Sequence, residues 1–216
     1  MRKRKTPIAK DLSKKFANQI YDAACAEPYL WLEKAREMRR AADLIWDQFH
    51  KEIVDYTLGG EYTGEPFTGA VAMMLYGFTI ENMLKAGLVG KGIAVKPNGN
   101  FELTSHDLEY LATELSVKLC SEEQELLERL EAFLVWAGRY PIPRFKDDLY
   151  PQIWHDGSKG SIMNFGTSVR ESIDCLIAKI QASLPDDNAA ITSYVRFCTG
   201  DRGIPKDSSP NQNSKK

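Results

Sequence analysis

The chain has 216 residues and a formal net charge of −2, which fits one domain of ordinary size and argues against a wholesale basic nucleic-acid binder. Hydrophobic residues make up 43% of the sequence and charged residues 27%, close to the averages of globular proteins, so a fibrous or fully disordered chain is excluded. The four cysteines are widely scattered and form no CxxC pair, which favours reduced thiols over a disulfide framework or a zinc site.

The sequence predicts no membrane segment. The longest apolar run without a charge, residues 66–80, has 15 residues, whereas a spanning helix needs about 20. The first 15 residues carry seven basic side chains and one acid, and the apolar stretch that a secretion signal requires does not follow them. We therefore expect a cytoplasmic protein whose residues 1–9 form a flexible basic tail.

Apolar residues recur at steps of three and four along most of the chain, which is typical of amphipathic helices. Helices are expected over residues 9–26, 28–58, 67–89, 104–115, 121–136 and 165–184. Pro28 suits the first turn of the second helix. The third helix is apolar on nearly every side, which predicts that it lies at the centre of the fold.

Two helix starts carry sequence signatures of capping. Thr104 with Asp107, and Ser121 with Gln124, resemble capping boxes in which side chains bond the first free backbone amides. Gly138, followed closely by proline, is expected to end the helix that begins at Ser121.

The fold class predicted is all-α, an antiparallel helical bundle with a four-helix core and additional N- and C-terminal helices. Residues 10–184 are expected to form a single domain, in which the proline- and glycine-rich stretch 139–163 is loop-like. Residues 185–216 lose the periodicity and end in a polar run, so we expect them to be mostly irregular or disordered.

Three segments are distinctive as a set: residues 73–85 (MMLYGFTIENMLK), 105–112 (SHDLEYLA) and 136–143 (WAGRYPIP). In this order they resemble a known family, the HEPN-like bacterial helical domains. The resemblance covers roughly residues 30–145 and implies an antiparallel four-helix bundle, frequent dimerisation and often a metal-independent RNase activity. It also implies a setting in toxin–antitoxin or defence systems, beside a nucleotidyltransferase or an antitoxin.

One departure from the family lowers the expectation of catalysis. Its nuclease members carry an Arg four to six residues ahead of a His. The histidines of this chain are His50, His106 and His155, and none has an Arg at those positions. The departure favours a binding or regulatory role over cleavage.

Polar residues in and beside the three segments form the candidate site. Its members are Glu81, Asn82, Lys85, His106, Asp107, Arg139 and Tyr140. Polar side chains inside an apolar helix are costly unless partners satisfy them, so we expect the helices to bring these groups together. One interpretation is a buried polar network that fixes helix register.

The other interpretation is a ligand pocket for a phosphate or a base. Lys85 and Arg139 would hold the anion, assisted by the free amides at the helix start near Asp107. If chemistry occurs, His106 is the candidate general acid–base and Arg139 would stabilise charge on a scissile phosphate. Tyr140 would stack on a base or pack under its own loop.

Two observations weigh against broader readings. Residues 107–131 hold eight acids and two bases, so that face should repel nucleic acid. Trp46 and Trp136 occur at helical spacing and are expected in the core rather than in a stacking platform.

A further alternative is a helical metal phosphohydrolase. Its metal ligands would be the following residues: His50, His106, Asp107 and Asp174.

The sequence therefore leaves three functions open. The first is a non-catalytic HEPN-like protein, expected to be a homodimer, that binds RNA, a nucleotide or a companion protein such as a nucleotidyltransferase or an antitoxin. The second is a divergent RNase that uses His106 and Arg139. The third is a dimeric scaffold whose polar cluster is purely structural. No cofactor and no metal site is predicted for the first.

Overall fold

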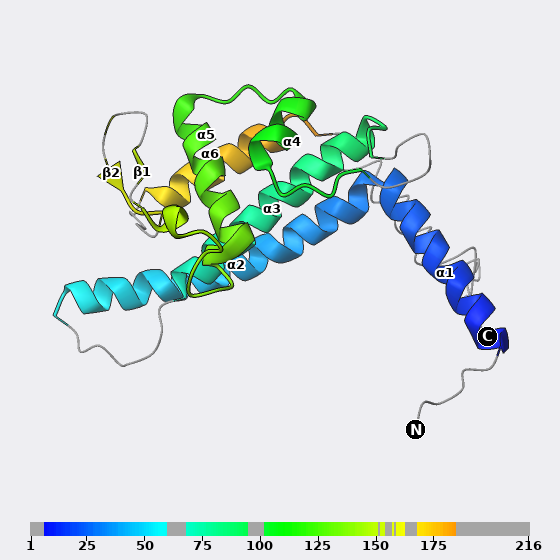
Figure 1. Cartoon of the computed structure of the whole chain (residues 1–216), viewed down its shortest axis with the longest axis horizontal. Helices are drawn as coiled ribbons and strands as arrows, with labels where there is room; N and C mark the ends of the chain where they lie inside the picture. The colour runs from blue at the N-terminus through cyan, green and yellow to red at the C-terminus, as the bar shows by residue number, and fades with distance from the viewer. Residues whose placement is uncertain are drawn as a thin grey trace, which may run out of the picture. The chain divides into compact units, whose positions relative to one another are not determined.

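The protein has the all-α fold predicted from its sequence (Figure 1). The structure is a computed structural model, and it describes residues 7–59, 68–94, 102–150, 152–153, 157, 159–162 and 168–184. The chain divides into a unit of residues 1–185 and a second unit of residues 186–216. The predicted C-terminal tail and residues 1–6 of the predicted N-terminal tail lie outside the described residues.

Two long helices begin the described chain. α1 spans Pro7–Ala26 and α2 spans Pro28–Thr57. They are separated by Glu27, whose extended backbone (φ −108°, ψ 101°) precedes Pro28 at the start of α2, as predicted. The Trp31 indole nitrogen donates to the carbonyl of Ala24 at 2.7 Å and ties the end of α1 to the first turn of α2.

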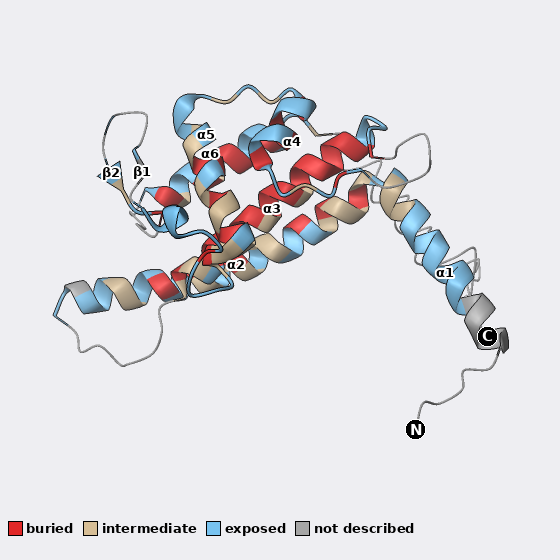
Figure 2. Ribbon diagram, viewed as in Figure 1, coloured by how far each residue is buried: buried red, intermediate tan, exposed pale blue. Residues whose placement is uncertain are grey.

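The third helix, α3 (Gly69–Gly90), is the centre of the unit, as its uniformly apolar sequence predicted. It runs beside α2 in the opposite direction (Figure 1). It also contacts α1 and three shorter helices, α4 (Leu108–Leu115), α5 (Ser121–Ala132) and α6 (Val169–Gln181). Figure 2 shows buried residues along its length. The helix also lies close to Leu134, in the turn that follows α5, because a Cβ added at Gly77 would lie 2.8 Å from Cγ of Leu134.

Shorter helices cover α3. They are α4 (Leu108–Leu115), α5 (Ser121–Ala132) with the π-helical turn η1 (Phe133–Ala137), and α6 (Val169–Gln181). Between η1 and α6 the chain forms a 3-10 turn, η2 (Lys146–Leu149), and an antiparallel pair of two-residue strands, β1 (Gln152–Ile153) and β2 (Lys159–Gly160). These short elements fall in the stretch predicted to be loop-like.

Both predicted capping boxes were wrong in register. α4 begins at Leu108 rather than near Thr104, because Asp107 itself is the cap and accepts from the Tyr110 amide at 2.8 Å. α5 is capped at Cys120, whose amide donates to the Glu123 carboxylate at 2.9 Å, rather than at Ser121 with Gln124. In each case the side chain that closes the first turn is a carboxylate, which is a stronger acceptor than a hydroxyl or an amide.

Among the helices that the structure describes, none combines the length and the hydropathy that spanning a lipid bilayer requires.

Candidate functional site

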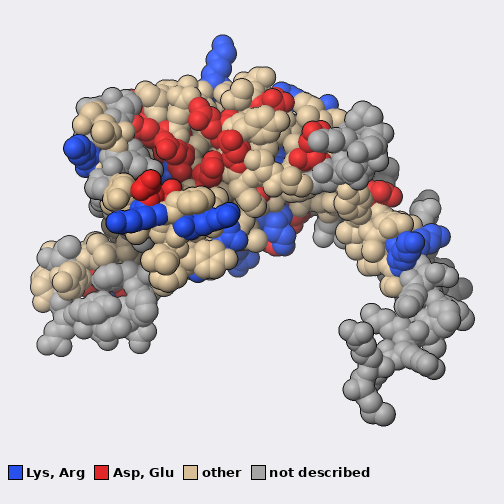
Figure 3. All heavy atoms as spheres, viewed as in Figure 1, with Lys and Arg blue, Asp and Glu red and all other residues tan. Residues whose placement is uncertain are grey.

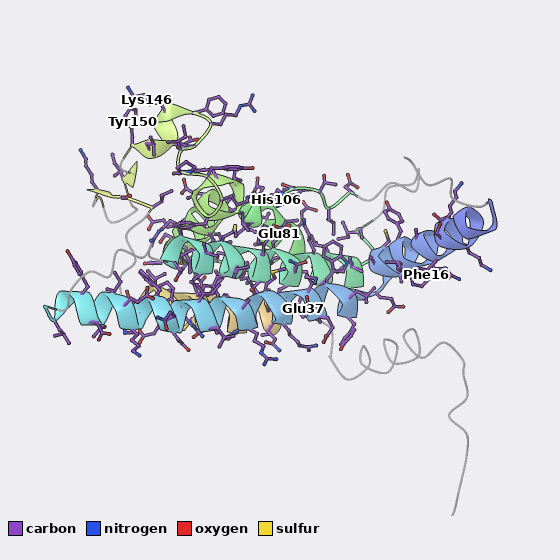
Figure 4. All side chains as sticks on the ribbon, turned by 90° about the horizontal axis from the view of Figure 1, so that it is seen from below. Phe16, Glu37, Glu81, His106, Lys146 and Tyr150 are labelled. Carbon is purple, nitrogen blue, oxygen red and sulfur yellow. The ribbon has the colours of Figure 1, made fainter. Side chains whose placement is uncertain are left out.

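The predicted polar cluster has a core of three residues from α3 and the segment before α4. Glu81 accepts from Lys85 Nζ at 2.6 Å with one carboxylate oxygen and from His106 Nδ1 at 2.8 Å with the other. Figure 4 shows Glu81 and His106 facing one another between the two segments. Of the seven residues of the predicted cluster, Glu81, Lys85 and His106 therefore come together, with Glu81 in contact with both of the others.

Burial divides the roles of the three residues. Glu81 and Lys85 are only 5% and 4% exposed, so their charges neutralise one another inside the protein. The Lys85 ammonium also lies 5.9 Å from the centre of the Trp31 ring. The His106 side chain is 48% exposed. Since the carboxylate can only accept, Nδ1 carries the proton, and Nε2 is the ring nitrogen left for an outside group.

The other predicted members do not join this core. Asn82 donates to the Phe78 carbonyl of its own helix at 2.6 Å. Arg139 donates to the carbonyls of Leu134 and, at 3.4 Å, Val135. Tyr140 is exposed and is not packed under its loop. Within the described residues, neither Arg139 nor Tyr140 forms a hydrogen bond or ion pair with Glu81, Lys85 or His106.

Lys85 and Arg139, the two cations of the predicted anion site, thus have different partners. The partners of Arg139 follow from η1, the wide turn that ends α5, where the amide of Gly138 donates to the carbonyl of Phe133 at 3.1 Å. This turn leaves carbonyls exposed at a helix C-terminus, and the Arg139 guanidinium folds back onto them. Gly138 is needed there because an added Cβ would lie 2.4 Å from Cβ of Met74.

An acidic pocket next to this core was not predicted as a site. Its volume is about 360 Å³, and it opens to solvent between the start of α4, the end of α5 and η2. The residues that line this acidic pocket are Asp107, Glu109, Glu128, Glu131, Ala132, Val135, Trp136 and Asp148. In Figure 3 acidic residues gather over α4 and α5. From the sequence, the acids of residues 107–131 were expected only to repel nucleic acid, and Trp136 was expected in the core. In the structure Trp136 is only partly buried and forms a wall of the pocket.

Local structure explains why the carboxylates converge. Glu128, Glu131 and Val135 lie three and four residues apart and share one side of α5 and its π-helical extension. Glu131 accepts from the Leu108 amide at 3.3 Å, which joins the end of α5 to the start of α4. Glu109 accepts from Gln124 at 2.8 Å, a second tie between the two helices.

The electrostatics of the acidic pocket are one-sided. The pKa of the Glu131 carboxyl is raised, first by burial and then by the negative charges of Asp107 and Glu128. The hydrogen bond from the Leu108 amide and the charge of His106 lower this pKa but do not reverse the shift. Among the described residues, no lysine or arginine forms an ion pair with any of the five carboxylates. An arrangement of this kind attracts a cation and repels an anion.

A second polar cluster, also missed, is balanced in charge. Asp174 on α6 accepts from Arg39 at 2.7 Å and from Arg170 at 3.0 Å. Asp43 on α2 accepts from the Tyr76 hydroxyl at 2.9 Å and pairs with Arg170 at 2.9 Å. The charges of the two arginines and the two aspartates thus cancel. Burial of the Tyr76 hydroxyl and its hydrogen bond to Asp43 raise the pKa of Tyr76. This neutral network joins α2, α3 and α6.

The metal-ligand set of the phosphohydrolase interpretation is not assembled. Asp174 pairs with Arg39 and Arg170, and Asp107 caps α4. In the part of the chain that the structure describes, no group of three His, Cys, Asp or Glu side chains is placed to hold a metal ion.

Comparison with known proteins gives no assignment. No family model, no curated protein and no solved structure matches the chain.

Proposed function

We propose that the chain is a non-catalytic, HEPN-like binding protein whose partner is another protein, held through a cationic segment in the acidic pocket. The observation that carries this proposal is the pocket itself: five carboxylates without a described basic partner surround an apolar wall that includes Val135 and Trp136. A lysine or arginine next to an apolar residue matches such a lining in both charge and polarity.

The same lining argues against RNA or a nucleotide as the ligand of this site. A phosphate in the acidic pocket would meet Asp107, Glu128 and Glu131 and would be repelled. The two cations that the anion hypothesis required are engaged elsewhere, Lys85 with Glu81 and Arg139 with its own helix. Of the three ligands considered from the sequence, a companion protein is the one these contacts support.

Catalysis by His106 lacks its second component. Glu81 orients the imidazole, which is the arrangement of a general base. Cleavage of RNA would also need a cation to stabilise charge on the phosphate, but Lys85, the cation that shares Glu81 with His106, is buried and paired with that carboxylate. The resemblance to HEPN-like domains suggests a nucleotidyltransferase or an antitoxin as the class of companion.

A binding assay with three fluorescent probes tests the proposal. The probes are a peptide of alternating Arg and Phe, the same peptide with Glu in place of Arg, and a single-stranded RNA oligonucleotide. We expect only the Arg–Phe peptide to bind, with Glu128→Gln weakening it about fivefold because one unpaired carboxylate is removed. Glu114→Gln, on the exposed end of α4 outside the pocket, is the matched control and should bind like the wild type.

Two results would refute the proposal. One is RNA binding that exceeds peptide binding at the same ionic strength. The other is RNA cleavage that His106→Ala abolishes, which would establish the RNase alternative instead.

A further inference from the structure

The middle of α1 leaves large apolar side chains in water. Residues 13–22 are all exposed, and Figure 2 shows this part of the helix in pale blue. Phe16 is 62% exposed and Ile20 is 42% exposed, one turn apart on the same side of α1 (Figure 4 labels Phe16). Within the described residues, neither side chain belongs to the hydrophobic core or packs against it. An amphipathic helix of a globular protein normally turns its apolar side toward the core, so this side of α1 is available to an outside partner.

The sequence continues this pattern toward the start of α1. Ile8 and Leu12 precede Phe16 at the same four-residue spacing, within the span of the helix. We call these two residues, with Phe16 and Ile20, the apolar stripe. The residues of α1 that lie three or four positions from Phe16 and Ile20 carry no charge: Leu12, Ser13, Ala17, Gln19, Ala23 and Ala24.

Positive charge is concentrated in and before α1. Residues 1–26 hold seven basic and two acidic side chains, whereas the whole chain has 28 basic and 30 acidic residues. Lys15 lies about 100° from Phe16 around the helix axis, at the edge of the apolar stripe, and Lys14 lies on the opposite side. Both lysines are exposed, and neither forms an ion pair with a residue that the structure describes. A lysine at the edge of an apolar stripe can keep its methylene groups on the apolar surface and its ammonium in water.

We propose that α1 binds the surface of an anionic lipid bilayer. The helix lies along the surface, with the apolar stripe among the upper parts of the acyl chains and Lys15 at the level of the lipid phosphates. The basic residues before α1 add attraction to the negative surface potential of the bilayer. The bond from the Trp31 indole to the Ala24 carbonyl holds the other end of α1 on α2, which keeps the rest of the protein attached to the bound helix.

RNA fits α1 less well than a bilayer does. Stacking of a base on Phe16 would need cations on the same side of the helix to contact the phosphates. The positions around Phe16 on that side are uncharged, and Lys14 lies on the other side. An uncharged apolar side with cations at its edge is the pattern of helices that lie in a membrane interface.

Co-sedimentation of the full chain with phospholipid vesicles tests the inference. The probes are vesicles of equimolar phosphatidylcholine and phosphatidylserine, and vesicles of phosphatidylcholine alone. We expect the wild type to bind the anionic vesicles and to bind the neutral ones much more weakly. Phe16→Ser should weaken binding about tenfold, because it removes a ring from the acyl chains. Lys15→Gln should weaken it about fivefold, and Lys14→Gln should weaken it less, because Lys14 lies on the side away from the bilayer.

Matched controls come from α2. Leu44→Ser removes an apolar side chain that is 67% exposed, and Lys51→Gln removes an exposed lysine, so both should bind like the wild type. Circular dichroism checks that every variant keeps the helical fold. α1 supplies no residue to the acidic pocket, so Glu128→Gln should weaken binding of the Arg–Phe peptide and leave vesicle binding unchanged.

Four results would overturn the inference. The first is equal binding to anionic and neutral vesicles, and the second is vesicle binding that Phe16→Ser does not weaken. The third is a chain that binds no vesicles but binds a single-stranded RNA oligonucleotide, with loss of that binding in Lys15→Gln, which would assign α1 to nucleic acid. The fourth is a chain that binds no vesicles but self-associates through Phe16, which would show that a second copy covers the stripe.

Discussion

Glu81 and His106, 25 residues apart, are joined by a hydrogen bond of 2.8 Å that connects the buried centre of α3 to an exposed imidazole. The other oxygen of the same carboxylate pairs with Lys85. Glu81 therefore holds two partners of different exposure, and its charge is balanced within the protein only while Lys85 is present. This relationship predicts an unequal response to single and double substitutions.

The first prediction concerns the buried ion pair. Lys85→Met should lower the free energy of unfolding by about 3–5 kcal/mol, because it leaves the Glu81 carboxylate buried without its cation. The double variant Glu81→Leu, Lys85→Met should lose much less, since no unpaired charge remains. Urea denaturation measures both. Lys34→Met, which breaks an exposed pair with Glu37, is the control and should cost less than about 1 kcal/mol. Equal losses in the single and double variants would contradict the prediction.

The second prediction is a pH dependence at Glu131. Its pKa is raised in the folded protein, so the folded state holds this proton more strongly than the unfolded state. Stability from this group is therefore present at acidic pH and is lost as pH rises through the raised pKa. Glu131→Gln should be more stable than the wild type at about pH 7, and the two should converge below about pH 4, where unfolded glutamate is also protonated.

Urea unfolding at several pH values gives the difference between Glu131→Gln and the wild type. Gln retains the carbonyl oxygen that accepts from the Leu108 amide, so the hydrogen bond is kept. Glu114→Gln serves as the control, and its difference in stability from the wild type should not change in this way with pH. A difference independent of pH would show that the effect of Glu131 is not electrostatic.

The third prediction tests the close approach of Gly138 to Met74. Gly138→Ala should reduce the free energy of unfolding by about 1–3 kcal/mol, because the added methyl group would lie 2.4 Å from Cβ of Met74 and the π-helical turn would have to shift. Thermal denaturation measures the loss. The double variant Gly138→Ala, Met74→Ala removes Cγ and Sδ of Met74 but not its Cβ, so it should recover little. Full recovery would place the strain in the longer part of the Met74 side chain.

The fourth prediction separates the enzyme and scaffold readings of Arg139. Because its guanidinium bonds the carbonyls of Leu134 and Val135, Arg139→Ala should lower stability by about 1 kcal/mol. It should leave binding of the Arg–Phe peptide unchanged. Arg40→Ala removes a comparable exposed arginine from α2 and should leave the melting temperature as it is. An Arg139→Ala protein with native stability and lost RNA cleavage would support the enzyme.

The sequence predicted best where one local pattern decided the outcome. Pro28 set the start of α2, and the apolar circumference of α3 required a central position. Glu81 and Lys85 were expected to need partners because they interrupt that circumference, and His106 proved to be one. A proline inside a helix costs free energy, and so does a buried polar group without a partner. Few other structures of these segments are therefore stable.

The sequence predicted worst where the outcome depended on backbone register between helices. The π-helical turn after α5 has no distinct sequence signature, yet it directs Arg139 back to Leu134 and makes Trp136 a pocket wall. The acids of α4 and α5 were recognised individually. Their convergence depends on the tie between Glu131 and Leu108, which joins segments that sequence spacing does not relate.

The ion pair between Arg39 and Asp174 has a consequence for how the protein is made. These residues are 135 positions apart, and α6 supplies Asp174 and Arg170 to the neutral network around Tyr76. During synthesis, α2 and α3 leave the ribosome before α6. Asp43 can therefore pair with Arg39 early, but it can pair with Arg170 only after α6 has been made. The joining of α6 to α2 and α3 is therefore completed late in synthesis. A chain that ends before α6 should be a substrate for chaperones or proteases rather than a smaller folded protein.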